Sequence, residues 1–362
     1  MAGRTIAIGD IHGDYDALQT LLAKLPELDA EDTLVFLGDY VDRGPHSAEV
    51  IDLIRNELPK RTKAQIRALR GNHEDGWIRV FDGGWPEFVI PANNGCLATY
   101  RSFAKKPFSE GDFMEPEEFA VMQNASFIPP DVLAWLRDLP FWYEDEHAIY
   151  VHAGLIENEQ GWLHPKDTPN PLYLLWVRTL RFFTEYDGKR VICGHTSTDN
   201  LPPELDGFTP EDPLDIWGRD KVFVIDTGCG KGGFLTALEL PNLTVYESRM
   251  KPVCPQRNRR SVPRKLRRFS LLEAGLPRLL RLRFCGTVGL PLRRAILLVV
   301  AGASPHFCVG LAERLINDPV GDPLKRGISG DEQLHILLEE GLALALGNFR
   351  PRFGGRLDHR SR

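Results

Sequence analysis

Residues 32–44, DTLVFLGDYVDRG, join a short apolar run to a loop that carries two aspartates and an arginine. The run from Thr33 to Leu37 has the length and composition of a buried strand, and a glycine follows it. The same order of apolar run and glycine-bearing polar loop recurs at residues 4–14, RTIAIGDIHGD, and at 65–74, QIRALRGNHE. The three stretches therefore predict three strands whose loops lie at one edge of a sheet.

Segments with apolar residues at helical spacing follow the first two loops, from Asp16 to Leu25 and from His46 to Leu58. Repeats of strand, loop and helix are typical of βαβ units. Residues 75–140 are rich in aromatic residues and prolines, and we expect them to contain a mostly helical cap. Further strand-like runs lie at 147–154, 189–196, 221–228, 234–240 and 243–248. The whole pattern predicts an α/β fold with two mixed sheets flanked by helices.

The charge is divided unevenly along the 362 residues. Residues 1–250 contain 23 Lys and Arg against 41 Asp and Glu, whereas residues 251–362 contain 21 against 9. The net charges of −18 and +12 predict two parts with different roles or origins, one up to residue 250 and a basic extension after it. The extension is rich in Arg, Pro, Gly and Leu without a steady period, so we expect it to be poorly ordered.

The basic residues 251–300 could bind nucleic acid or another acidic partner, but a non-native or poorly selected extension is the favoured interpretation. No apolar run is long enough for a membrane span, and the N-terminus lacks the features of a signal peptide. The six cysteines show neither a regular spacing nor a CxxC pair. The cysteine usage predicts a reducing, cytoplasmic location, and the lack of a long apolar run predicts that the chain is not attached to a membrane.

Side chains that bind metals stand where the predicted strands end. Asp10 and His12 are two residues apart, so both can point into one loop mouth, and a carboxylate with an imidazole suits manganese, iron or zinc. His152 and His195 each follow an apolar run and precede a small residue; taken singly, either could be structural. Ligands at successive strand ends converge on the crevice outside the sheet edge.

Five ordered motifs carry a resemblance to a known family: GDxHG, GDxVDRG, GNHE, HAG and GH. They resemble those of the serine/threonine phosphoprotein phosphatases, a branch of the calcineurin-like metallophosphoesterases, and span residues 4–248. The resemblance implies a metallophosphoesterase β-sandwich with a carboxylate-bridged pair of divalent ions. Manganese is the first choice of metal, with iron or zinc as alternatives. Two ions about 3.5–4 Å apart can activate a hydroxide for in-line attack on phosphorus.

The resemblance also implies a role for each motif residue. Asp10 and His12 would hold the first ion, and Asp39 would bridge the two ions. The ligands of the second ion would be Asn72, His152 and His195.

Catalytic roles follow from the same resemblance. His73 would be the general acid that protonates the leaving oxygen, and Asp42 would orient its imidazole. Arg43 and Arg178, the latter in the segment LLWVR, would bind the phosphoryl oxygens. Asp226 matches a further motif but is expected to support the metal loops from outside the core site.

The family resemblance favours a bacterial type of protein serine/threonine phosphatase, acting on a phosphoprotein or a small phosphoester. Residues 225–240, IDTGCGKGGFLTALEL, replace the eukaryotic signature that contains SAPNYC. The alternative is a symmetrical diadenosine tetraphosphate hydrolase, which shares the metal site. Such enzymes usually lack Asp and Arg in the second motif and have GNHD as the third, so Asp42, Arg43 and Glu74 argue against it.

Overall fold

The structure is a computed structural model that describes residues 3–209, 211–212 and 214–250. Its twelve strands among these residues form two five-stranded sheets and one hairpin. The strands of the first sheet are β1 (Thr5–Ile8), β2 (Thr33–Phe36), β3 (Gln65–Ala68), β11 (Thr236–Leu240) and β12 (Thr244–Glu247). Those of the second are β4 (Trp142–Glu144), β5 (Ile149–Val151), β8 (Val191–Cys193), β9 (Trp217–Arg219) and β10 (Val222–Val224). The hairpin is β6 (Glu157–Asn158) with β7 (Gly161–Trp162).

Both large sheets are mixed. In the first, ordered β12-β11-β1-β2-β3, the strands β1, β2 and β3 are parallel and the other two pairings are antiparallel. In the second, ordered β4-β5-β8-β10-β9, the strands β5, β8 and β10 are parallel, with an antiparallel strand at each edge. Each sheet thus has three parallel strands whose carboxyl ends point the same way, which is the arrangement that gathers loops at one sheet edge.

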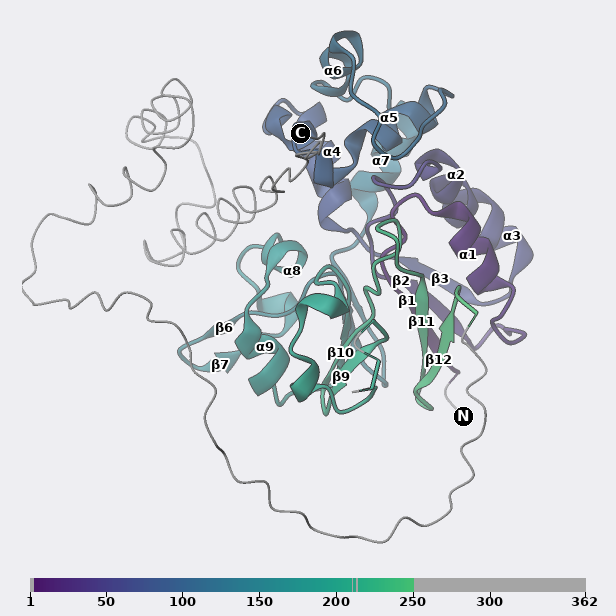
Figure 1. Cartoon of the computed structure of the whole chain (residues 1–362). Coiled ribbons are helices and arrows are strands. Elements are labelled where there is room, and N and C mark those ends of the chain that lie inside the picture. Colours follow the sequence, from purple (N-terminus) through teal and green to yellow (C-terminus); the bar gives the residue numbers. More distant parts are fainter. Residues whose placement is uncertain (1–2, 210, 213, 251–362) are drawn as a thin grey trace, which may run out of the picture. The chain divides into compact units, whose positions relative to one another are not determined.

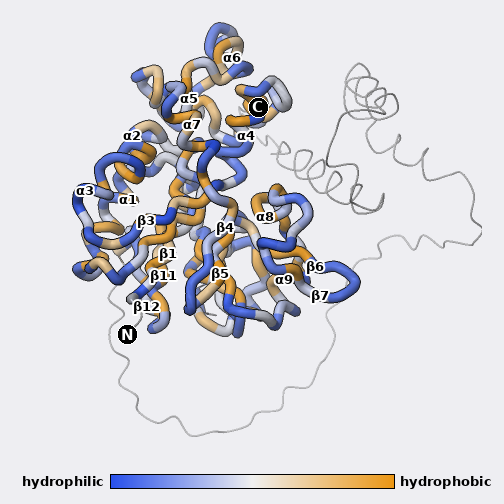
Figure 2. The backbone as a smooth tube through the Cα atoms, turned by 180° about the vertical axis from the view of Figure 1, so that it is seen from behind, coloured by the Kyte–Doolittle hydropathy of each residue, from blue (hydrophilic) through white to orange (hydrophobic). Residues whose placement is uncertain are grey.

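The alternation of side chains along the strands builds the core in layers. In β1, Ile6 and Ile8 pack under the helices while Ala7 faces the second sheet. In β8, Val191 packs on the outer side of its sheet while Ile192 joins the layer between the sheets. Because successive side chains of a strand point to opposite faces, strands apolar throughout serve two layers at once. Figure 2 shows β1 and β5 as largely hydrophobic, in contrast to the hydrophilic β6–β7 hairpin.

Helices cover the outer face of the first sheet and rise above it as a cap. Figure 1 shows α1, α2 and α3 beside β1–β3, the helices α4 to α7 grouped beyond the sheet edge, and α8 and α9 beside the second sheet. Four are α1 (Tyr15–Leu22), α2 (Ser47–Asp52), α3 (Leu58–Arg61) and α4 (Asn72–Phe81). The others are α5 (Cys96–Phe103), α6 (Pro116–Met122), α7 (Pro130–Asp138), α8 (Tyr173–Trp176) and α9 (Leu180–Glu185).

The predicted architecture of two mixed sheets, flanking helices and a helical cap is confirmed. The helix predicted at 16–25 spans Tyr15–Leu22: it begins one residue earlier, where the Asp14 side chain accepts the Ala17 N–H at 2.9 Å and caps α1, and it ends three residues earlier. The helix predicted at 46–58 extends to Arg61 through a π-helical turn, η1 (Leu53–Glu57), between α2 and α3.

The basic extension, residues 251–362, lies outside the described residues. Among the described helices, none has the length and apolar character needed to cross a membrane.

Candidate metal centre

The predicted metal ligands converge although they come from five strands of two sheets. Asp10 and His12 follow β1, and Asp39 follows β2. Asn72 begins α4 directly after the β3 loop, and His152 and His195 follow β5 and β8. These six residues are buried. Burial of so many ionisable and polar groups in one place is unusual unless they are paired or bind an ion.

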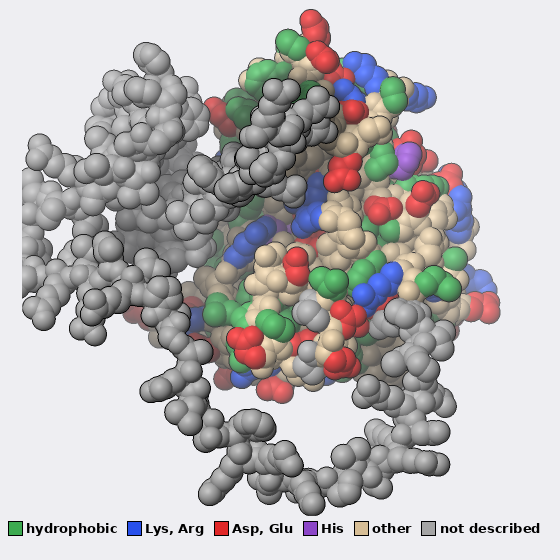
Figure 3. Space-filling model, in the orientation of Figure 1, with side chains coloured by type: hydrophobic (Ala, Val, Ile, Leu, Met, Phe, Trp, Pro, Cys, Tyr) green, Lys and Arg blue, Asp and Glu red, His purple; other side chains and the backbone are tan. Residues whose placement is uncertain are grey.

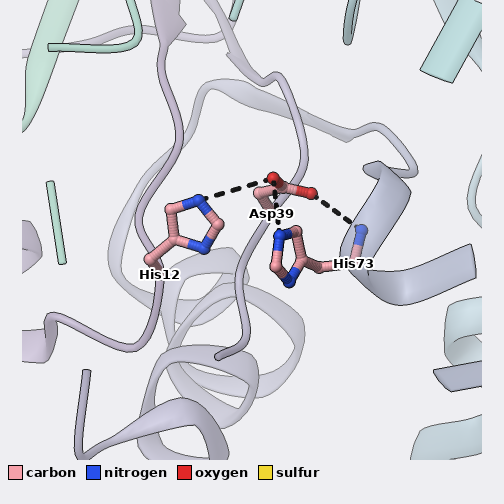
Figure 4. A group of neighbouring side chains, drawn as sticks. All are labelled: His12, Asp39 and His73. Carbon is pink, nitrogen blue, oxygen red and sulfur yellow. Dashed lines mark hydrogen bonds and ion pairs between the residues drawn. The ribbon is translucent and has the colours of Figure 1, made fainter. Parts of the chain in front are cut away.

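Asp39 is the shared member of two groups of potential ligands. The first ligand cluster is His12, Asp39 and His73, and the second is Asp39, His152 and His195; within each, one ligand atom per residue lies within 4.8 Å of the others. The Oδ2 atom of Asp39 is 3.4 Å from His12 Nε2, and its Oδ1 atom is 3.4 Å from His152 Nε2. Figure 4 shows the carboxylate of Asp39 facing the rings of His12 and His73. One carboxylate thus presents an oxygen to each cluster.

The second ligand cluster crosses from one sheet to the other. The Oδ1 atom of Asn72 is 2.8 Å from His152 Nε2 and 2.9 Å from His195 Nδ1. The amide oxygen therefore lies with the two imidazoles, as expected for a ligand of the same ion. The other ring nitrogen of His152 faces the Leu37 carbonyl at 3.0 Å, which fixes the ring with Nε2 toward the centre.

Asp10 is next to the clusters but is a member of neither. Its carboxylate accepts the backbone N–H of His195 at 3.0 and 3.2 Å. Burial raises the pKa of Asp10 well above its usual value, and the carboxylates of Asp226 and Asp39 raise it further. This crowding of buried negative charge would be relieved by a cation.

The imidazoles of both ligand clusters also suit metal binding. Burial lowers the pKa of His12 and of His195 well below the usual value, and the nearby Arg43 and Arg178, respectively, lower it further. Neutral imidazoles with buried carboxylates and an amide oxygen are a mixed nitrogen and oxygen donor set that suits manganese, iron or zinc. The residues present therefore fit a pair of divalent ions.

His73 and Asp42 form a tightly held pair at the edge of the first ligand cluster. The Nδ1 atom of His73 is 2.6 Å from Asp42 Oδ2, so the Nε2 atom is the one that remains on the side of Asp39, 3.9 Å from its Oδ2. Trp77 Nε1 and the Thr99 hydroxyl donate to the other oxygen of Asp42, at 2.9 and 2.6 Å. Asp42 is therefore held from three sides and fixes the imidazole of His73.

The two arginines flank the centre from different sides. Arg43 contacts the Nε2 atom of His12 and lies 3.2 Å from that of His73. Arg178, just after α8, donates from Nε to His195 Nε2 at 2.8 Å. Each guanidinium thus lies beside one ligand cluster. The space-filling view shows Lys and Arg side chains gathered between the cap helices and the region of α8 (Figure 3).

The backbone of the site adopts an uncommon conformation. Of the nine described non-glycine residues with positive φ, five are predicted site residues: His12 (50°), Asp39 (55°), Asp42 (72°), Arg43 (70°) and His195 (63°). A left-handed backbone is unfavourable for most side chains and persists where the surroundings enforce it. Such strain gathers at functional sites, and here it turns the ligand side chains toward one point.

Sequence reasoning missed several residues that hold the site. Glu74 accepts the backbone N–H groups of Asp39, Tyr40 and Gly71, each at 2.8 Å, and so ties the second loop to the third. Burial and the charge of Asp39 raise the pKa of Glu74 to about 8. The sequence signal for this role is the position of Glu74 in the motif GNHE. Thr99 and Trp77 carried no sequence signal, because their contacts to Asp42 are made across the cap.

A model of the Calcineurin-like phosphoesterase family matches residues 3–199. The chain belongs to this family. Enzymes of the calcineurin-like phosphoesterase family use divalent metals, and the two ligand clusters could bind them. The predicted membership of the metallophosphoesterase superfamily is therefore confirmed, and the serine/threonine phosphatase branch remains a prediction.

Several relatives are similar to this chain over most of their own length. The symmetrical bis(5'-nucleosyl)-tetraphosphatase of Cronobacter sakazakii is 39% identical, over 67% of this chain and 93% of its own. That of Dechloromonas aromatica is 31% identical, over 68% and 96%. The asymmetrical enzyme PrpE of Halalkalibacterium halodurans is 28% identical, over 65% and 89%.

The shared position of Asp39 predicts that Asp39→Asn removes both metal ions. We expect the metal content to fall from about two ions per chain to about none, because the amide lacks the negative charge that bridges both sites. Elemental analysis after dialysis against manganese measures this directly. The control Asp167→Asn, an exposed residue, should keep both ions. Two ions retained in Asp39→Asn would remove Asp39 as the bridge.

The three hydrogen bonds of Glu74 predict a large stability loss in Glu74→Ala. Three buried N–H groups lose their acceptor, so we expect the free energy of unfolding to fall by about 3 kcal/mol. Urea unfolding of the full chain measures the change. Glu159→Ala, in the exposed turn between β6 and β7, should change it by less than about 0.5 kcal/mol. A similarly small change in both variants would contradict the structural role of Glu74.

Proposed function

We propose that the protein is a metal-dependent phosphoesterase that hydrolyses bis(5'-nucleosyl) tetraphosphates. The observation that carries this proposal is the match to tetraphosphatases over about nine-tenths of their length, at up to 39% identity. Sequence reasoning preferred a protein phosphatase because of Asp42, Arg43 and Glu74. The relatives favour the alternative, a diadenosine tetraphosphate hydrolase.

The ligand assignment is part of the proposal. His12 and Asp39 would hold one ion, with Asp10 completing the set from its position beside His195. Asp39 would also reach the second ion, whose remaining ligands would be Asn72, His152 and His195. Manganese is the proposed metal, with iron or zinc as alternatives. The bound ions would supply charge for the phosphoryl oxygens and would activate the nucleophile.

The protein's own residues would bind the phosphoryl group and move a proton. Arg43 beside the first ligand cluster and Arg178 beside the second can each donate two parallel N–H groups to phosphoryl oxygens. His73 would give a proton from Nε2 to the leaving oxygen, and Asp42 would hold the opposite nitrogen and stabilise the charged ring. A proton donor held in place in this way speeds the protonation of the leaving oxygen as its bond to phosphorus breaks.

A protein serine/threonine phosphatase is the second candidate, and the Asp42–His73 pair favours it. A serine or threonine alkoxide is a strongly basic leaving group and depends on a proton donor. A nucleoside diphosphate leaves as a weakly basic phosphate oxygen and depends on the donor less. The buried, charge-supported imidazole of His73 therefore suits a phosphomonoester as well.

The remaining assignments rest on the sequence. We propose residues 1–250 as the catalytic domain, with the cap within about 75–140, and a cytoplasmic location. The candidate substrates are small phosphoesters and phosphoproteins.

A side-by-side assay separates the two candidate substrates. The metal-stripped protein, reconstituted with manganese, is given diadenosine tetraphosphate and, separately, a phosphoserine peptide. We expect faster release of nucleotide than of phosphate from the peptide, measured as kcat/KM by chromatography. Asp39→Asn, expected to be inactive on both, controls for contaminating enzymes. Faster hydrolysis of the peptide would favour the second candidate.

His73→Asn tests the proton donor. We expect the hydrolysis of a phosphoserine peptide to fall by about 10²- to 10⁴-fold. That of p-nitrophenyl phosphate, whose leaving group needs little protonation, should fall far less, and the metal content should stay near normal. His46→Asn, in an exposed position before α2, is the matched control and should behave like the unchanged protein. Equal losses on both substrates would contradict the assignment.

A further inference from the structure

A lysine outside the predicted site lies at the edge of the metal centre. Lys231 belongs to the glycine-rich loop 226–233, which follows β10 at the same sheet edge as the ligand loops. Its Nζ atom is 3.5 Å from Asp226 Oδ2, and about a third of the side chain, 32%, is exposed. Asp226 itself is fully buried. The loop therefore carries a cation that is anchored on one side and open to solvent on the other.

The glycines of this loop bring it against the first ligand cluster. Gly230 has a φ of 72°, and a Cβ atom at this position would lie 2.5 Å from His12 Cβ and 3.5 Å from Arg43 Cβ. Only a residue without a side chain permits this approach. Turn hydrogen bonds from Lys231 N and Gly233 N to the Gly228 carbonyl, both at 2.9 Å, hold the loop. Lys231 is thus one residue from a backbone that touches His12 and Arg43.

The positive charge of Lys231 affects the pKa of three residues of the centre. Burial is the main cause of the raised pKa of Asp10 and of the lowered pKa of His12 and His195, and the lysine lowers all three. An ammonium group has three donors. The bond to Asp226 is the one side-chain hydrogen bond of Lys231 found within residues 3–209, 211–212 and 214–250. Donors therefore remain for an anion in the open part of the site.

The two arginines and the lysine bring positive charge to the centre from three different loops. Arg43 and Arg178 lie beside the two ligand clusters, where a single phosphoryl group would be held between them. Lys231 adds a third positive charge, one residue from the glycine that packs against His12 and Arg43, and its Nζ atom lies beside Asp226 rather than beside a predicted metal ligand. A phosphomonoester has no further charge to place there, whereas a polyphosphate chain does.

We propose that Lys231 binds a second phosphate group of the substrate, next to the one that is attacked, and so selects substrates with a polyphosphate chain. This inference rests on the proposed tetraphosphatase function and deepens it. Lys231 would be a specificity-determining residue, distinct from the residues that hold metal or move the proton. A competing explanation is that it only offsets the buried charge of Asp226, and the experiment must separate the two.

Binding of ADP and AMP to the manganese-loaded full chain tests the proposal. The two nucleotides share a base and a sugar and differ by one phosphate, and titration calorimetry needs no turnover. We expect the unchanged protein to bind ADP more tightly than AMP. In Lys231→Met the dissociation constant of ADP should rise by about tenfold, with that of AMP changed by less than about twofold. Lys231→Arg should keep most of the preference.

Lys221→Met is the matched control, because Lys221 is exposed and precedes β10 at the opposite end of the strand. It should leave both constants unchanged. A metal analysis accompanies each variant. An equal weakening of ADP and AMP, or a loss of metal in Lys231→Met, would show that the lysine only supports Asp226 and would overturn the proposal. So would an unchanged protein that does not prefer ADP.

The calorimetry and the substrate assay can fail separately. If diadenosine tetraphosphate is not hydrolysed but the preference for ADP depends on Lys231, the proposed function is wrong and the second phosphate position stands. If the substrate is hydrolysed equally well by Lys231→Met and the preference persists, the inference is wrong and the proposed function stands.

Discussion

The contact between one carboxylate and two groups of ligands governs the rest of this structure. Asp39 presents Oδ2 to the first ligand cluster and Oδ1 to the second, and its backbone is left-handed at φ 55°. Gly71 makes this geometry possible, since a Cβ atom there would lie 2.2 Å from Asp39 Oδ1. The loops after β2 and β3 are consequently locked together, with Glu74 accepting N–H groups from both.

Such a centre opposes folding while it serves function. Buried carboxylates lose hydration, and a backbone at positive φ costs energy at five of the predicted site residues. The apolar layers on both faces of each sheet offset these costs. Burial, and after it the carboxylates of Asp226 and Asp39, raise the pKa of Asp10, and a bound cation would offset these costs by neutralising the negative charge. Metal binding and the stability of these loops are thus expected to be coupled.

The sequence was sufficient wherever a signal was local. The apolar runs before Asp10, Asp39 and His152 predicted both the strands and the edge at which the ligands meet. Contacts between residues far apart in the chain could not be predicted from the sequence. Thr99 donates to Asp42 from 57 positions away, and no motif near Thr99 indicates this contact. Substrate preference was least accessible, because the motifs describe chemistry at one phosphorus and not the groups around it. Lys231 illustrates this, as its significance appears only from the packing of Gly230 on His12.

The origin of the second ligand cluster has a mechanical consequence. Asp39 and Asn72 come from the first sheet, whereas His152 and His195 come from the second, and an apolar layer that includes Ile192 joins the two sheets. A sliding motion of one sheet over the other would therefore change the distances among these four side chains. Side chains in the middle of the molecule therefore act as spacers between the two pairs of residues, and their volume helps to set the distance between Asp39 and Asn72 on one side and His152 and His195 on the other.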